Sequence, residues 1–191
     1  MRIREWVAEN IGYRFFGCLY NRSHDHIFRF IKSKVPEDFL YRSISDLGCG
    51  DGGNTIRIQR VFSPKEIIGY DHNDFLLERA KKRGVRAEKI DFKFGLPKGE
   101  MGVFTFSLHH APDKEKTLRE AVNNFQFIFL CEPSLDLYHW LLDGGTPLPK
   151  RKWIELFDKV LGQYLLYEYK NNLIVFYRRV SIAGSDPAML Y

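Results

Sequence analysis

Short apolar runs alternate with amphipathic stretches from Ser43 to Cys131, and this alternation constrains the fold more than any other feature. The apolar runs, which we expect to be strands, lie at residues 44–47, 66–71, 85–90, 103–108 and 126–131. The amphipathic stretches, which we expect to be helices, lie at residues 54–62, 73–84 and 113–123. Strands that alternate with helices are typical of a parallel sheet covered by helices on both faces. The sequence therefore predicts an α/β domain.

The two ends of the chain follow other patterns. Residues 151–161 predict an amphipathic helix, and β-rich runs at residues 163–170 and 173–180 flank Asn171-Asn172, which is typical of a hairpin turn. Residues 1–42 predict a helical extension in which Ser23 caps a helix that ends before Pro36. We therefore expect an N-terminal extension (1–42), an α/β domain that finishes in an antiparallel hairpin (43–182) and a tail (183–191).

Composition and charge exclude several classes of protein. No apolar run approaches the roughly 20 residues that a membrane-spanning helix needs, and acidic residues interrupt the basic start before a signal-peptide core forms. The three cysteines lie far apart, and no Cys-x-x-Cys or His-x-x-x-His spacing indicates a metal site. We expect a cytoplasmic protein with no membrane contact and no bound metal.

A glycine-rich loop follows the first predicted strand, in the stretch ISDLGCGDGGN. Its G-x-G-x-x-G spacing, with Asp71 about 20 residues further on, is the pattern of a dinucleotide-binding loop. However, Asp46 and Asp51 would bring negative charge close to a pyrophosphate, at a cost that grows as water is excluded. A ligand with an adenosine and a cation in place of phosphates fits better, and S-adenosylmethionine is such a ligand. A nicotinamide-dependent oxidoreductase remains the alternative.

Four segments resemble the motifs of the class I S-adenosylmethionine-dependent methyltransferases: DLGCGDGG, IIGYD, KID and FTFSLHHAPDKEKTLREA. The last is similar to the corresponding segment of the small-molecule branch. The resemblance covers Ser43 to Pro133, and it departs at residues 122–126, where the family usually has a Lys/Arg-Leu-Pro-Gly-Gly sequence. It implies a Rossmann-like fold with a mostly parallel seven-stranded sheet, S-adenosylmethionine as cofactor, and methyl transfer as the reaction.

The resemblance also implies roles for individual residues. Asp46, Gly48 and Gly50, with Cys49 and Gly52 in the same loop, would line the methionine part of the cofactor. Asp71 would accept both ribose hydroxyls, with His72 beside the adenine. Asp91 would accept the adenine amino group, with Phe92 flanking the ring. Ser107 and Leu108 would lie beneath the reactive methyl group.

Two groups of residues outside these motifs are candidates for function. His109 and His110 could act as a general base, or could hold a metal with Asp113, a reading that the resemblance disfavours. The aromatic residues of the N-terminal part either pack on the sheet or form a lid over the acceptor; they are Trp6, Tyr13, Phe15, Phe16, Tyr20, Phe28 and Phe30. His24 and His26 are two apart on a predicted helix, so they do not share a face, and we expect both at the surface.

The acceptor is the least constrained part of the prediction. We expect a small molecule as the methyl acceptor. RNA is the second candidate, because the formal net charge is +5. The sequence contains no Asp/Asn-Pro-Pro-Tyr/Phe segment, and this argues against amino-methylation of adenine or cytosine. A domain that binds the cofactor without turnover remains a further alternative, and the oligomeric state is open.

Overall fold

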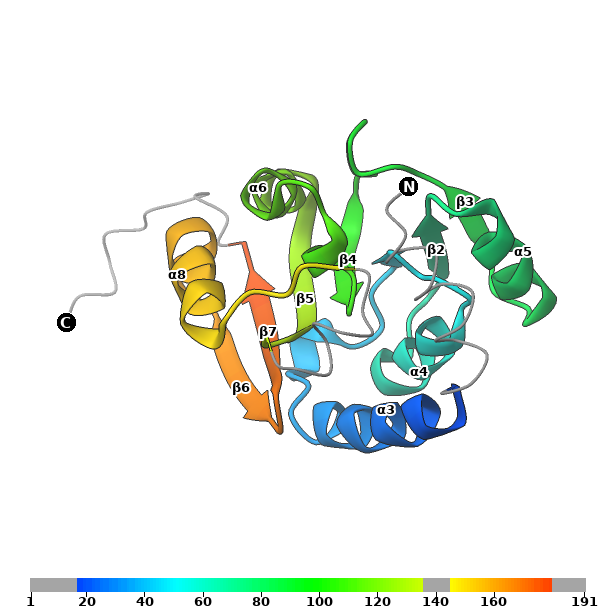
Figure 1. Ribbon diagram of the computed structural model, residues 1–191, viewed down its shortest axis with the longest axis horizontal. Helices are drawn as coiled ribbons and strands as arrows, with labels where there is room; N and C mark the ends of the chain where they lie inside the picture. Colours follow the sequence, from blue (N-terminus) through cyan, green and yellow to red (C-terminus); the bar gives the residue numbers. More distant parts are fainter. Residues whose placement is uncertain (1–16, 136–144, 180–191) are drawn as a thin grey trace, which may run out of the picture.

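A seven-stranded sheet organises the part of the chain that the computed structural model describes, residues 17–135 and 145–179 (Figure 1). The strands lie in the order β3-β2-β1-β4-β5-β7-β6. Their bounds are β1 Ile44–Leu47, β2 Ile67–Asp71, β3 Ala87–Lys89, β4 Gly99–Thr105, β5 Phe125–Pro133, β6 Leu165–Tyr169 and β7 Asn172–Arg178. The pairs among β1 to β5 are parallel, whereas β7 is antiparallel to both β5 and β6. The predicted fold class is confirmed.

Helices cover both faces of this sheet (Figure 1). Their bounds are α3 Gly17–Lys32, α4 Gly53–Phe62, α5 Asp74–Lys82, α6 Lys114–Asn124 and α8 Lys150–Leu161, with short 3-10 turns η2 Glu37–Phe39 and η3 Leu108–His110. Helices α6 and α8 pack on one face, and α3 and α4 on the other. Among the described residues, no helix is long and apolar enough to span a membrane.

The two layers of the core follow from the alternation of side chains along each strand. In β5, Ile128 and Leu130 pack beneath α6 and α8, whereas Phe127 and Phe129 pack beneath α3 and α4. These four side chains are at most 2% exposed. A strand that is apolar on both faces is expected in the middle of a helix-covered sheet, which places β5 and its neighbours as the rigid support of the site.

Several predicted bounds differ from the structure by a few residues, and two of these differences have a clear local cause. The fourth strand runs over Gly99–Thr105 rather than residues 103–108, because Phe106 turns the backbone with φ +56° and residues 108–110 form η3. The hairpin turn consists of Lys170 and Asn171, one residue earlier than predicted, because Asn172 pairs with Tyr169 in the ladder.

The N-terminal part contains a helix as predicted, but the helix begins at another residue. Helix α3 runs continuously through Ser23, so this residue lies within the helix and is not its cap. Ile27, Phe28 and Ile31 are buried in the core, which supports the packing interpretation for this segment. The other aromatic residues that suggested a lid, Trp6, Tyr13, Phe15 and Phe16, lie outside the described residues, as do the side chain of Tyr20 and the tail 183–191.

Candidate active site

The glycine loop joins β1 to α4 at the carboxyl edge of the sheet. Gly48, Gly50 and Gly52 all have positive φ, at +83°, +54° and +79°, which side chains other than glycine rarely adopt. A Cβ on Gly48 would also lie 2.5 Å from the Cβ of Ser107, at the end of β4. Cys49 is buried between them, and burial raises the pKa of its thiol well above the usual range, so it is a packing residue. The loop thus brings bare backbone close to a ligand position.

Asp71 ties this loop to the next helix. Its Oδ2 accepts a hydrogen bond from the Gly50 N–H at 2.9 Å, and its Oδ1 accepts one from the Asn73 N–H at 2.9 Å. His72 lies beside it, with Nδ1 3.5 Å from Oδ1, and is largely exposed. An ionised carboxylate has about four acceptor positions, so Asp71 retains capacity for two further donors such as vicinal hydroxyls.

Asp46 has a different environment from the one its motif suggests. Its side chain is fully buried, and Oδ2 accepts a hydrogen bond from the Thr55 hydroxyl of α4 at 2.6 Å. Burial raises the pKa of Asp46 to about 7. The carboxyl group therefore supports the loop from behind, where it holds α4 against β1.

Asp51 is neutralised by basic residues of α5 and its C-cap. Its Oδ2 is 2.8 Å from Arg83 and 3.5 Å from Arg79, and Oδ1 accepts the Gly53 N–H at 3.1 Å. The open acidic rim expected from Asp46 and Asp51 is therefore not what the structure shows. The spacing of the motif does not predict this compensation, because Arg83 lies 32 residues further along the chain than Asp51.

Asp91 and Phe92 follow β3, next to β2 and Asp71. The Asp91 Oδ1 accepts the Lys93 N–H at 2.9 Å, and the Phe92 ring packs edge-on against Phe104 with centroids 6.0 Å apart. Because β2 and β3 are parallel neighbours, their carboxyl ends meet at one edge. The structure thus brings the two predicted adenosine-contacting acids to the same side of the site.

Ser107 and Leu108 lie after β4, and their N–H groups donate to Glu132, an acid that the sequence analysis did not single out. Glu132, in β5, accepts the N–H groups of Ser107 at 3.0 Å and Leu108 at 2.8 Å through Oε1. Its Oε2 is 2.6 Å from Nδ1 of His109. Both the Glu132 and His109 side chains are fully buried. An acid inside an apolar strand needs a partner to offset its desolvation. The position of Glu132 directly after the apolar run of β5 is the sequence feature that could have identified it.

The opposite side of His109 is closed by the segment that follows residue 144. A Cβ on Gly145 would lie 2.3 Å from Cδ2 of the His109 ring, so glycine is required for this contact. The Thr146 N–H donates to the His109 carbonyl at 3.1 Å, and the Lys114 ammonium donates to the Thr146 hydroxyl at 2.8 Å. Of the two predicted catalytic histidines, His109 is buried and paired with Glu132, whereas His110 is exposed and its ring lies against that of His109 with centroids 4.2 Å apart.

His24 also departs from its prediction. The residue is buried, at 7% exposure, whereas His26 two residues later is exposed as expected. The separation of two residues does place the rings on different faces of α3, and one of these faces is turned toward the sheet.

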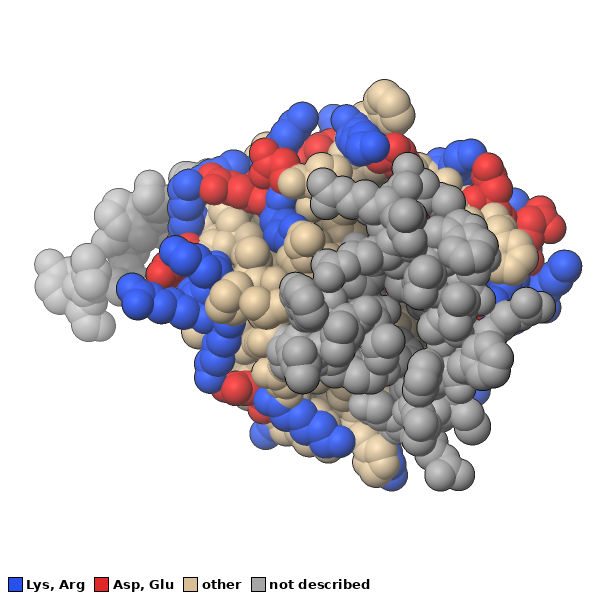
Figure 2. Space-filling view, viewed as in Figure 1, with Lys and Arg blue, Asp and Glu red and all other residues tan. Residues whose placement is uncertain are grey.

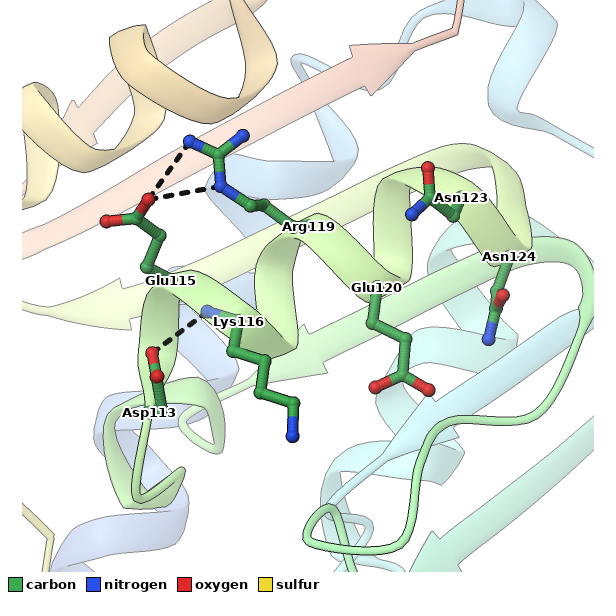
Figure 3. Close-up of a pocket in the computed structure, with 7 residues that line it drawn as sticks. All are labelled: Asp113, Glu115, Lys116, Arg119, Glu120, Asn123 and Asn124. Carbon is green, nitrogen blue, oxygen red and sulfur yellow. Dashed lines mark hydrogen bonds and ion pairs between the residues drawn. The ribbon is translucent and has the colours of Figure 1, made fainter.

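A polar groove of about 550 Å³ lies on the outer face of α6 (Figure 3). It is lined by Asp113, Glu115, Lys116, Arg119, Glu120, Asn123 and Asn124. Glu120 and Asn124 are committed to the main chain of Leu96, through its N–H at 2.7 Å and its carbonyl at 2.9 Å. Two of the lining residues therefore anchor the loop after Phe92, and of the candidate site residues only Asp113, considered as a metal ligand, lines the groove.

Comparisons with known proteins agree with this geometry. Residues 42–134 match a family model described as a methyltransferase domain. A search of curated proteins gave no match.

Solved structures share the fold. An S-adenosylmethionine-dependent methyltransferase from Thermotoga maritima gives a TM-score of 0.70 at 13% identity, over 92% of this chain and 99% of its own. A Haloferax volcanii methyltransferase complex with the activator Trm112 gives 0.68 at 11% identity, over 93% and 98%. Mitomycin 7-O-methyltransferase gives 0.64 at 16% identity, over 93% and 60%.

The glycine cradle with Asp71 and Asp91 at adjacent strand ends fits an adenosine-containing ligand, and the family match sets the nicotinamide alternative aside. The chain therefore contains a class I S-adenosylmethionine-dependent methyltransferase domain.

Proposed function

We propose that the domain methylates an oxygen or nitrogen atom of a small molecule, with His109 as the general base. The observation that carries the proposal is the buried pair of His109 and Glu132 at the carboxyl ends of β4 and β5, 2.6 Å apart. An unactivated hydrocarbon carbon would leave such a pair without a proton of suitable acidity to remove. The Thermotoga neighbour is described as a candidate histamine N-methyltransferase and another neighbour as an O-methyltransferase, which is consistent with both atom types.

The cofactor site in this proposal is the carboxyl edge around the glycine loop. Gly48, Gly50 and Gly52 allow the backbone to approach the ligand closely, and Cys49 packs beneath the loop. S-adenosylmethionine, when bound, supplies a methyl group that its sulfonium has already activated. The acidic side chains, with Asp46 acting from behind, orient the ligand so that proximity contributes most of the rate.

Each adenosine contact is assigned to one residue. Asp71 accepts the ribose hydroxyls, with His72 beside the adenine, and Asp91 accepts the adenine amino group, with Phe92 against the ring face. Ser107 and Leu108 form the floor, and both are fully or almost fully buried. The hydrogen bond from the Ser107 hydroxyl to the Leu47 carbonyl, at 2.5 Å, supports the position of this floor relative to β1.

His109 has the connections that a general base requires. Glu132 accepts a hydrogen bond from Nδ1, which fixes the tautomer, and Nε2 is the atom that would take a proton from the acceptor. The carboxylate also stabilises the imidazolium that forms. General-base catalysis of this kind contributes roughly 10²- to 10⁴-fold.

The same contacts also permit a purely structural role, since Glu132 accepts main-chain N–H groups as well. The test is kinetic. With radiolabelled S-adenosylmethionine and a panel of phenols, alcohols and amines, His109→Asn should lower kcat by roughly 10²-fold or more with unchanged affinity for S-adenosylhomocysteine. Glu132→Gln should shift the acidic limb of the pH–rate profile. His26→Asn, at an exposed histidine of α3, is the matched control.

Equal loss of cofactor affinity and kcat in His109→Asn would assign the pair to structure. Absence of labelled product across the panel, with cofactor still bound, would favour a domain that binds without turnover. RNA as the acceptor would appear as labelled nucleic acid when RNA is added to the same assay.

A further inference from the structure

His24 occupies a position between the two halves of the candidate cofactor site. It lies in α3, is 7% exposed, and its ring stacks on Phe106 with centroids 4.5 Å apart and an interplanar angle of 18°. Its Nδ1 is 3.0 Å from Oδ1 of Asn54, which is an acceptor, so Nδ1 donates. One imidazole from the N-terminal helix therefore contacts residues of α4 and of the β4 end.

Both contacted residues adjoin proposed cofactor-binding residues. Asn54 lies in the first turn of α4, directly after the glycine loop. Phe106 directly precedes Ser107, whose Cβ approaches Gly48 so closely that no side chain fits there. His24 thus bridges the two strand ends, β1 and β4, between which the glycine loop and the floor of the site meet.

Phe106 needs such support because of its backbone conformation. Its φ of +56° is unfavourable for a residue with a side chain, and such conformations persist only when their surroundings hold them. Here the Phe106 N–H donates to the Cys131 carbonyl at 2.8 Å, and the ring lies against His24. Movement of this ring would displace Ser107 and, through it, the floor.

Helix α3 also holds α4 by a second connection. The Arg57 Nε donates to Asp25 at 2.8 Å, and the same guanidinium donates to the Gly53 carbonyl at 3.1 Å. Asp25 is the residue after His24, so adjacent positions of α3 reach the same helical turn. The start of α4 is therefore set by α3 and not only by the loop.

We infer that His24 is a positioning residue of the cofactor site, which sets the distance between the first turn of α4 and the end of β4 through Asn54 and Phe106. The inference rests on the proposed placement of the cofactor at the glycine loop and Ser107. In this inference α3 helps to position the residues of the site, whereas the sequence predicted a separate extension.

The test measures the Kd for S-adenosylhomocysteine by calorimetry on the full chain, with thermal unfolding of each variant alongside. His24→Ala should raise Kd about tenfold, the equivalent of one neutral hydrogen bond. His26→Ala, two residues along the same helix and exposed, should leave Kd unchanged. His24→Phe keeps a ring on Phe106 and loses the bond to Asn54, so its Kd should lie between those of His24→Ala and the wild type.

A double-variant comparison isolates the bond itself. Asn54→Ala removes the same bond and also the contact between Arg57 and Asn54 Oδ1 at 3.4 Å, so it should raise Kd at least as much as His24→Phe does. The double variant should bind no more weakly than Asn54→Ala alone, because both changes remove the His24–Asn54 bond. These two variants also carry the test if His24→Ala does not fold.

The outcomes separate this inference from the proposed function. If the wild type binds and all His24 variants match His26→Ala in Kd while only their thermal stability falls, the residue is structural and the inference is overturned. If the wild type does not bind S-adenosylhomocysteine at all, the proposed cofactor site is wrong, and the inference about His24 is wrong as well.

Discussion

Asp46 carries the residue-scale consequence that is simplest to measure. Burial raises its pKa to about 7, whereas an unfolded chain leaves it at about 3.9. Below about pH 4 both states hold the proton, and between about pH 4 and 7 only the folded state keeps it. The free energy of unfolding therefore falls as the pH rises through this window, and above about pH 7 the effect is complete. The total is roughly 4 kcal/mol on an order-of-magnitude scale.

The prediction concerns the difference in unfolding free energy between the wild type and Asp46→Asn. Asp46→Asn keeps an oxygen that accepts the Thr55 hydroxyl bond and removes the titration. Urea unfolding from about pH 4.5 to 7.5 should show the wild type losing stability relative to Asp46→Asn as the pH rises. Two curves that stay parallel over this range would show that Asp46 is ionised in the folded protein.

At the scale of elements, the contact between η3 and the chain after residue 144 controls the His109 ring. Gly145→Ala places a methyl group 2.3 Å from Cδ2 and 2.9 Å from Nε2 of His109. Because the ring must move, kcat should fall by roughly ten- to a hundredfold, while S-adenosylhomocysteine affinity stays constant, since the glycine loop is elsewhere.

Gly162→Ala is the matched control for this prediction. Gly162, after α8, has φ +73°, and none of the described residues lies within 4 Å of the added Cβ, so alanine strains the backbone without touching the described part of the site. It should lower thermal stability and leave kcat unchanged. If both glycine variants reduce kcat in proportion to their loss of stability, the contact with His109 has no catalytic role.

At the scale of the whole molecule, the net charge is +5, and the basic residues at the start of α8 are candidates for contact with RNA. Basic side chains lie over α8 with acidic ones between them (Figure 2). Lys150 pairs with Glu168, and Arg151 and Lys152 both pair with Glu155. Paired cations release few counterions on binding phosphate, which favours the small-molecule acceptor over RNA.

Filter binding of single-stranded RNA across a salt series checks this expectation. Each phosphate neutralised on a single strand contributes a slope of about −0.7 in log affinity against log salt. We expect weak binding, no saturable complex below about micromolar concentration at physiological salt, and a slope close to that of one or two phosphates. A tight complex with a slope of several units would make RNA the acceptor.

The sequence by itself determined the sheet, the glycine loop and the acids at two strand ends. Apolar alternation reports the local backbone and its burial, and the need for positive φ is encoded in the glycines themselves, as at Gly48. Element boundaries were less reliable where a single residue decides them, as Phe106 and Asn172 show.

Only the tertiary structure decided which polar groups meet. His109 and Glu132 are 23 residues apart, His24 and Asn54 are 30, and Arg83 and Asp51 are 32. Periodicity carries no information about such pairs, because their distance depends on how helices and strands pack across the sheet. Burial and pairing then changed the chemistry of Asp46 and Asp51, whose charge in the sequence looked available to a ligand and in the folded protein is taken up by the protein itself.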